Sequence, residues 1–193
     1  MGGRDKCLRE IGGRTILGRV IERARPQVCG LLLNANGDGA RFRDYRLPVA
    51  ADVIAGFAGP LAGILTAMEW ARTQWPECRF VASFATDTPF FPHDMVARLR
   101  SAIEAASADI ACAASGGRTH PVFAVWPVRL APLLRSAMEN EDMRKIDAWT
   151  ARFRIETVPF DAEGYDPFFN VNAPGDLAEA EARLALSARE ISR

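Results

Sequence analysis

The feature that most constrains the fold is a regular alternation of short apolar runs with longer stretches of helical periodicity. Turn residues bound the short runs, which predicts strands, and apolar residues three and four positions apart predict amphipathic helices. This alternation is typical of an α/β protein with a mostly parallel sheet wrapped by helices. The predicted strands are 28–33, 48–51, 80–85, 110–114, 121–126 and 155–159. The predicted helices have apolar faces within 16–24 and 64–71, or span 93–106, 128–138, 144–152 and 177–186.

Size and charge limit the possible functions. One hydrophobic core can serve a chain of 193 residues. Because neither a repeat nor a long linker divides the sequence, we expect a single domain over 1–193. The 24 basic side chains balance the 24 acidic ones, which argues against nucleic-acid binding and favours a small or specifically docked partner.

Several protein classes are disfavoured by what the sequence does not contain. No apolar stretch is long enough to cross a bilayer and no secretory signal pattern is visible, so we expect a cytoplasmic protein without membrane contact. The four cysteines lack metal-ligand spacing and are predicted to be reduced thiols. Neither G-x-S-x-G nor G-x-x-x-x-G-K-[ST] occurs, which disfavours serine hydrolases and the common phosphate-loop ATPases.

The segment RFVASFATDTPFFP carries the clearest chemical signal, because Asp87 directly follows the predicted strand 80–85. Ligands of open α/β sheets bind at the carboxyl ends of strands, so Asp87 is predicted to lie at that edge. A carboxylate oxygen there suits Mg²⁺, which takes its other ligands from water and substrate phosphates. The alternative is that Asp87 caps the next helix.

Two more polar groups stand at predicted strand ends. Asn34, like the nearby Asn36, could present its amide to a ligand or form a structural Asx turn. Asp52 follows the strand 48–51 and has two oxygens that match the N1–H and exocyclic amine of guanine. A hydrogen bond within its own loop is the alternative for Asp52.

Gly59 and Gly63, in FAGPLAG, stand at the mouth of a predicted helix, and Pro60 suits its first turn. Two glycines there would let a ligand approach the backbone closely. A plain helix start is the alternative interpretation.

His120, in GGRTHPVFAVW, precedes a predicted strand and lies two residues after Arg118. The imidazole could contact a substrate phosphate or a pterin. It could equally orient the entry into the strand.

Six motifs occur in order along the chain: MGGRDKCL, LNAN, GPLAG, TDTPF, HPVFAV and FFNVNAPGDL. In this order and spacing the sequence resembles the molybdenum cofactor guanylyltransferases over nearly its whole length. The resemblance implies a Rossmann-like, three-layer nucleotidyltransferase fold. It also implies transfer of GMP from GTP to the phosphate of molybdenum-molybdopterin, with Mg²⁺ as cofactor and pyrophosphate as product. A monomer that meets molybdenum-insertion and molybdoenzyme chaperone proteins would fit the same role.

The resemblance assigns roles to individual residues. Lys6 resembles a lysine that contacts the nucleotide phosphates and Asp87 resembles the magnesium ligand, so both would be catalytic. Asn170 and Asn172 match the paired asparagines of an N-V-N-T-P segment that is implicated near the pterin. The residues predicted to contact substrates or cofactor are Lys6, Asn34, Asp52, Gly59, Gly63, Asp87, His120, Asn170 and Asn172.

The sequence departs from the family pattern in two places. Family members begin with a strand that enters L-A-G-G-x-S-x-R-M-G-G, whereas this sequence starts at the methionine inside that loop. We therefore expect the first, central strand to be missing, which would leave two strands without ladder partners at about 1 to 3 kcal/mol per buried unpaired group. In NVNAPGDL, Ala173 replaces a capping threonine, which predicts a helix start weakened by about 1 kcal/mol.

Two other functions fit the same motifs. One is a molybdopterin cytidylyltransferase, which would use CTP in place of GTP. The other is a catalytically impaired protein that binds the cofactor but lacks the phosphate loop.

Overall fold

A computed structural model describes residues 6–56, 59–162 and 164–191 of the chain. Its helices are α1 (Ile16–Ala24), α2 (Pro60–Gln74), α3 (Met95–Ala106), α4 (Ala131–Asn140), α5 (Ile146–Thr150) and α6 (Pro174–Ile191). Its strands are β1 (Glu10–Ile11), β2 (Arg14–Thr15), β3 (Leu33–Asn34), β4 (Val49–Ala50), β5 (Phe80–Ser83), β6 (Ile110–Ser115), β7 (Arg118–Pro127) and β8 (Ile155–Pro159). None of the helices in these residues combines the length and apolar character needed to cross a membrane.

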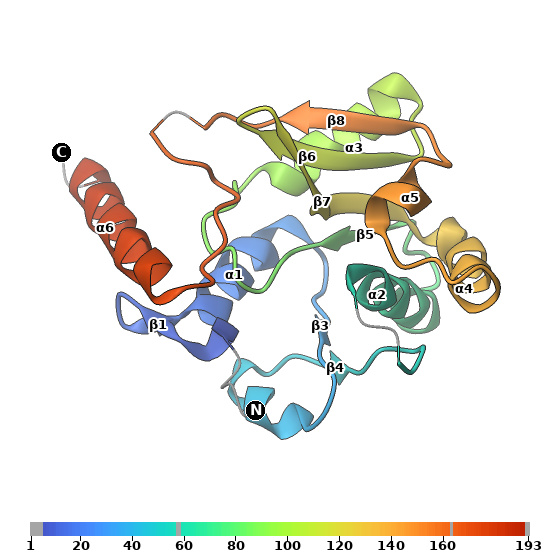
Figure 1. Ribbon diagram of the computed structural model, residues 1–193, viewed down its shortest axis with the longest axis horizontal. Coiled ribbons are helices and arrows are strands. Elements are labelled where there is room, and N and C mark those ends of the chain that lie inside the picture. The colour runs from blue at the N-terminus through green and yellow to red at the C-terminus, as the bar shows by residue number, and fades with distance from the viewer. Residues whose placement is uncertain (1–5, 57–58, 163, 192–193) are drawn as a thin grey trace.

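Helices cover both faces of a four-stranded sheet formed by β5 to β8 (Figure 1). Alternate residues of β6 point to opposite faces, so Ile110 and Cys112 pack with α2, α4 and α5. Ala111 and Ala113 pack with α1 and α3 on the other face. The predicted α/β fold with three layers is therefore confirmed.

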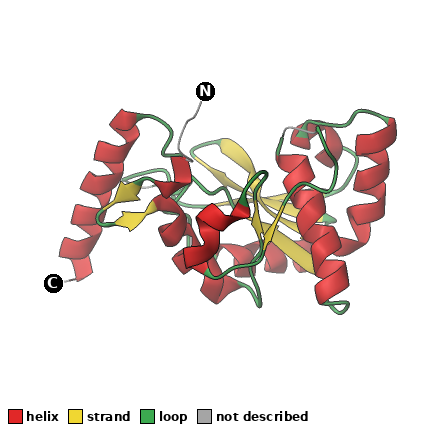
Figure 2. Cartoon of the chain, turned by 90° about the horizontal axis from the view of Figure 1, so that it is seen from below, coloured by secondary structure: helices red, strands yellow, loops and turns green. Residues whose placement is uncertain are grey.

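The helix α6 lies apart from this sheet, at one end of the molecule (Figure 2). A smaller apolar cluster joins α6 to β1 and α1 through Ile11, Ile16, Val171 and Ala180. The segment that leads into α6 thereby runs from the sheet to the hairpin of β1 and β2.

The four-stranded sheet is mixed rather than mostly parallel. Its order is β5-β7-β6-β8, with β7 antiparallel to both neighbours and β6 parallel to β8. The reversal between β6 and β7 is made by Gly116 and Gly117, at φ of 53° and 76°. Two residues at positive φ form a tight hairpin turn that only an antiparallel pair can use.

The predicted strand 28–33 is much shorter in the structure. Only Leu33–Asn34 forms a ladder, with β4, through the N–H of Leu33 on Pro48 (3.0 Å) and the N–H of Ala35 on Ala50 (2.9 Å). Residues 28–32 are outside any strand, since no strand in the described part of the chain lies beside them. Strand 155–159 has its predicted bounds, and the helix predicted at 177–186 begins earlier, at Pro174.

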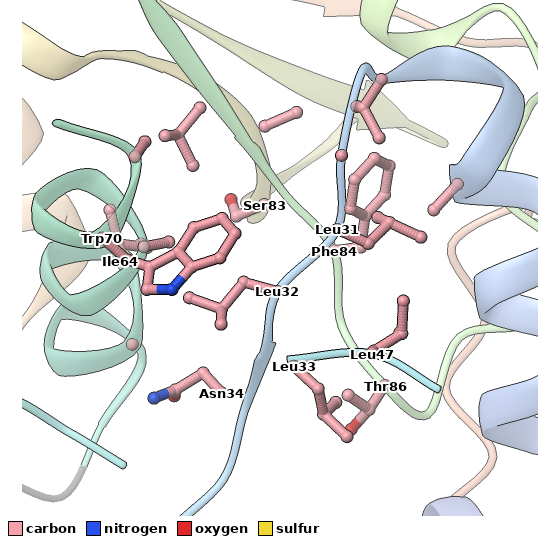
Figure 3. Close-up of a pocket in the computed structure, with 18 of the residues that line it drawn as sticks. Leu31, Leu32, Leu33, Asn34, Leu47, Ile64, Trp70, Ser83, Phe84 and Thr86 are labelled. Carbon is pink, nitrogen blue, oxygen red and sulfur yellow. The ribbon is translucent and has the colours of Figure 1, made fainter. Parts of the chain in front are cut away.

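An apolar cavity of about 360 Å³ separates segment 28–33 from β5. Leu32, Trp70 and Ser83 face one another across it, with Leu31 beside Phe84 (Figure 3). In the described residues β5 pairs only with β7, so its edge toward the cavity carries no ladder. An opening of this size is more than twice the roughly 150 Å³ of a cavity that can hold benzene.

Candidate functional site

Asp87 lies beyond the carboxyl end of β5, as predicted. The N–H of Val171 donates to the backbone oxygen of Asp87 at 2.8 Å. The buried hydroxyl of Thr88 donates to Oδ1 of Asn170 at 2.5 Å and lies 3.4 Å from Oδ1 of Asp87. The structure thereby brings Asn170 beside Asp87, although Asn170 is 82 residues from Thr88 in the sequence.

Lys6 and Asn172 meet next to this pair. Nζ of Lys6 donates to Oδ1 of Asn172 at 3.4 Å, from opposite ends of the chain. The first group of predicted residues that the fold assembles is therefore Lys6, Asp87, Asn170 and Asn172.

Asp176 also belongs to this region, although it is not among the residues predicted from the sequence. Its Oδ2 accepts from the N–H groups of Ala173 (2.7 Å) and Asn172 (2.8 Å). These hydrogen bonds lower the pKa of Asp176, and the charge of Lys6 adds to them. The carboxylate secures the start of α6, where Ala173 has no capping side chain. An acidic residue three positions after the N-cap was the available signal.

Asn34 and Asp52 form a second group at the ends of β3 and β4. Nδ2 of Asn34 donates to Oδ1 of Asp52 (3.0 Å) and to the backbone oxygen of Ala50 (3.1 Å). Nδ2 of Asn36 donates to Oδ2 of Asp52 (2.7 Å). Both N–H donors of Asn34 are thus engaged, so its carbonyl oxygen is the group it can offer a ligand.

The position of the Asn34 side chain requires a glycine at position 63. A Cβ at Gly63 would lie 2.5 Å from Oδ1 of Asn34, so the close approach made here is to a side chain. Gly59 has a different reason: it precedes α2 at φ of 139°, a conformation that L side chains rarely adopt.

His120 belongs to a third, partly buried network on β6 and β7. The Ser115 hydroxyl donates to Oδ1 of Asp166 at 2.6 Å, so the contact of 2.7 Å with Nε2 of His120 is made by an imidazole N–H. The ring stacks on Phe168 at 4.6 Å between centroids. Burial lowers the pKa of His120, Asp166 opposes this, and Arg118 adds to it. This geometry favours the orienting role for His120.

Removing the Ser115 hydroxyl should destabilise the protein. Burial opposes ionisation of Asp166, but the hydrogen bonds from Ser115 and from the N–H of Phe168 give it a lowered pKa. A carboxyl group whose pKa is lower in the folded than in the unfolded protein stabilises the fold at pH values above its unfolded-state pKa. This stabilisation is lost as the pH falls through the folded-state pKa. We expect Ser115→Ala to cost about 1 to 3 kcal/mol at neutral pH and less in acid.

Urea unfolding at pH 7 and at acid pH measures this difference. Ser101→Ala, at an exposed position of α3, is the matched control. A loss of equal size at both pH values would show that the bond to the Asp166 carboxylate is not its source.

The second of these groups lies at the cavity. Asn34, Asp52, Gly59 and Gly63 line it together with Thr86, the residue before Asp87. Apart from Asp52, none of the described residues that line the cavity is charged. The largely apolar lining is therefore unsuited to a phosphate.

The donor set at Asp87 limits the kind of metal site that it can form. No group of three or more His, Cys, Asp or Glu side chains suited to a metal ion occurs in the described residues. A half-buried carboxylate at a sheet edge still fits Mg²⁺, which commonly uses one or two carboxylates with water and substrate phosphates. Water and the substrate phosphates would complete the coordination of Mg²⁺ at such a site.

Comparison with known proteins shows the family of the chain. Residues 1–154 match the MobA-like NTP transferase domain. The molybdenum cofactor guanylyltransferase of Bradyrhizobium sp. (strain ORS 278) is 51% identical over 190 residues, which cover 98% of this chain and 90% of that protein. The enzyme of the same name from Rhodopseudomonas palustris (strain BisB5) is 52% identical over 186 residues, covering 96% and 88%.

A solved structure shares the fold. The crystal structure of molybdopterin-guanine dinucleotide biosynthesis protein A from Archaeoglobus fulgidus matches with a TM-score of 0.73, covering 95% of this chain and 92% of that one. Its 23% identity supports the fold alone. From the sequence matches, the chain belongs to the MobA-like NTP transferase family, among the molybdenum cofactor guanylyltransferases.

Proposed function

We propose that this chain transfers GMP from GTP to the terminal phosphate of molybdenum-molybdopterin. The observation that carries the proposal is the meeting of Lys6, Asp87, Asn170 and Asn172 at the carboxyl end of β5. Relatives about half identical to this chain carry the name of this activity. Asn34 and Asp52, which are hydrogen-bonded to each other and line the cavity, would supply a second contact region for the nucleotide.

The reaction requires no protein base. An oxygen of the molybdopterin phosphate attacks the α-phosphorus of GTP in line with the leaving group. The new P–O bond forms as the bond to the bridging oxygen breaks, and the electron pair leaves with pyrophosphate. A phosphate monoester has a second pKa of about 6 and is mostly dianionic at pH 7, so no proton must be removed. The engagement of His120 by Ser115 agrees with this.

The chain's own side chains would position the substrates and neutralise the charge of their phosphates. The Lys6 ammonium can turn from Asn172 to a phosphate oxygen, since their contact of 3.4 Å is long. Asn170 accepts from Thr88, and its Nδ2 has no partner within the described residues, so it can donate to a substrate. Mg²⁺ at Asp87 would supply charge neutralisation on the triphosphate. Asp52 would accept from guanine.

Product identity tests the proposal. Molybdenum-molybdopterin is incubated with Mg-GTP and, separately, with Mg-CTP, and the dinucleotide products are separated by chromatography. We expect the guanine dinucleotide. A cytosine product would favour the cytidylyltransferase alternative, and calorimetric binding of molybdopterin without binding of Mg-GTP would favour an impaired binding protein.

Gly63→Ala should weaken GTP binding by about 10-fold, on the scale of a hydrogen bond to a charged group. The new Cβ would displace Oδ1 of Asn34 and, with it, the amide that holds Asp52. Alanine is about 1 kcal/mol better than glycine inside a helix, which offsets part of any clash. Calorimetry gives the affinity and thermal melting gives the stability.

Gly175→Ala separates the two effects of the Gly63 change. A Cβ at Gly175, also in a helix, meets nothing within 4 Å. Gly175→Ala therefore reports the gain in stability from replacing a helical glycine by alanine, without any contact with Asn34. Unchanged GTP affinity in Gly63→Ala would argue against a role for Asn34 in the site.

We also infer that one domain spans 1–193 and that the cavity between segment 28–33 and β5 can accept an added β-strand. Two extended segments face the cavity there without a shared ladder, and its walls are apolar, as a buried strand requires.

The proposal includes the setting of the enzyme. We expect a cytoplasmic monomer that takes GTP and molybdopterin and meets molybdenum-insertion and molybdoenzyme chaperone proteins. The balanced charge of the sequence supports small or specifically docked partners.

A further inference from the structure

A reciprocal pair of hydrogen bonds joins Asn36 to Asp52. The backbone N–H of Asp52 donates to Oδ1 of Asn36 at 2.9 Å, and Nδ2 of Asn36 donates to Oδ2 of Asp52 at 2.7 Å. Because a backbone N–H can only donate, it settles which end of the amide faces each group. Asn36 therefore presents a donor to the carboxylate.

The other carboxylate oxygen is held in the same way. Nδ2 of Asn34 donates to Oδ1 of Asp52 at 3.0 Å and is itself anchored on the backbone oxygen of Ala50. Each carboxylate oxygen thus accepts from one amide and keeps a lone pair for a ligand. The backbone of Asn36 is fixed in turn, since Nη2 of Arg41 donates to its carbonyl oxygen at 2.9 Å.

We propose that Asn36 is a positioning residue for base specificity, which holds the Asp52 carboxylate in the orientation that accepts from the N1–H and exocyclic amine of guanine. The inference rests on the proposed function, because it takes Asp52 as the contact with the base. A carboxylate that is already oriented loses less freedom when the base binds. Asn36 acts through Asp52, and it is exposed while Asp52 is half-buried.

The dissociation constant for inosine triphosphate divided by that for GTP tests this role. Inosine lacks the exocyclic amine, so the ratio of the two dissociation constants measures how well the carboxylate recognises the base. For the wild-type protein we expect a ratio on the order of 10 to 100, the range for a hydrogen bond to a charged group. For Asn36→Ala we expect a ratio of about 1 to 3, because a mobile carboxylate recognises the amine poorly.

The ratio is insensitive to a merely structural loss. Partial unfolding would lower the active fraction equally for both nucleotides and leave the ratio unchanged. Asn140→Ala is the matched control, since Asn140 contacts Ser136 on the exposed surface of α4. Calorimetry with the magnesium complexes of the two nucleotides supplies both dissociation constants.

Exchanging the two residues separates stability from recognition. Asn36→Asp combined with Asp52→Asn restores an amide and carboxylate pair but moves the charge to position 36. We expect this double variant to recover the melting temperature lost in Asn36→Ala and to keep the low ratio.

Each failure has a distinct signature. If Asp52→Asn abolishes the preference for GTP and Asn36→Ala keeps it, the role of Asn36 is overturned and that of Asp52 stands. If Asp52→Asn also keeps the preference, the base contact itself is wrong. A wild-type protein that binds neither nucleotide would remove the proposed function together with this inference.

Discussion

Asp87→Asn is expected to lower the turnover of GMP transfer by at least about 100-fold, the scale seen when one preorganised electrostatic contact is removed from an active site. The substitution keeps the shape of the side chain but removes the charge that would hold Mg²⁺. Lys6 and the base contacts at Asp52 are untouched, so the affinity for GTP should change by only a few-fold. Turnover and affinity are measured by product formation and by calorimetry.

Asp94→Asn is the matched control for this change. Asp94 is an exposed residue before α3, and its ion pair with Arg98 spans 4.0 Å. Surface pairs of this kind contribute about 0 to 1 kcal/mol, so turnover should remain near that of the unchanged protein. Near-normal turnover in Asp87→Asn would instead refute the metal assignment.

Adding a strand is expected to produce the largest change in stability. A segment of five Val and Ile residues, joined ahead of Met1 by a short linker, should enter the cavity of about 360 Å³ beside β5. Filling a cavity and supplying ladder bonds can contribute several kcal/mol. For a chain of this length, that corresponds to a rise of about 10 °C or more in melting temperature.

The control uses the same segment with proline at its second and fourth positions, because proline cannot donate to a ladder. Fluorescence of Trp70, which faces the cavity, reports entry of the strand directly. Equal melting temperatures for the two fusions would show that the cavity does not accept a strand.

Much of the fold follows from local patterns. The strand at 155–159 and the helical face within 16–24 depend on apolar periodicity and on turn residues that bound them, and both occur as predicted. The reversal at Gly116 and Gly117 was also readable, because two glycines between apolar runs are a hairpin signal. This hairpin makes β6 and β7 antiparallel, so the expectation of a mostly parallel sheet is wrong.

Other parts could not be obtained from local patterns. The apolar run 28–33 has the composition of a buried strand, yet only Leu33–Asn34 pairs, since a ladder requires a neighbour that composition does not reveal. Asp166 bonds Ser115 across 51 positions, and no spacing rule connects such residues. Their meeting depends on how β6 and the segment before α6 pack.

The sequence alone determined that Asp52 and Asp87 follow the strands β4 and β5. It did so because a strand's end is marked locally, by where an apolar run stops and turn residues begin. Only the tertiary structure decided that Asn170 and Asn172 return to Asp87, that Gly63 makes room for Asn34, and that Asn36 holds Asp52. These are contacts between distant segments, whose geometry is set by packing of the whole core.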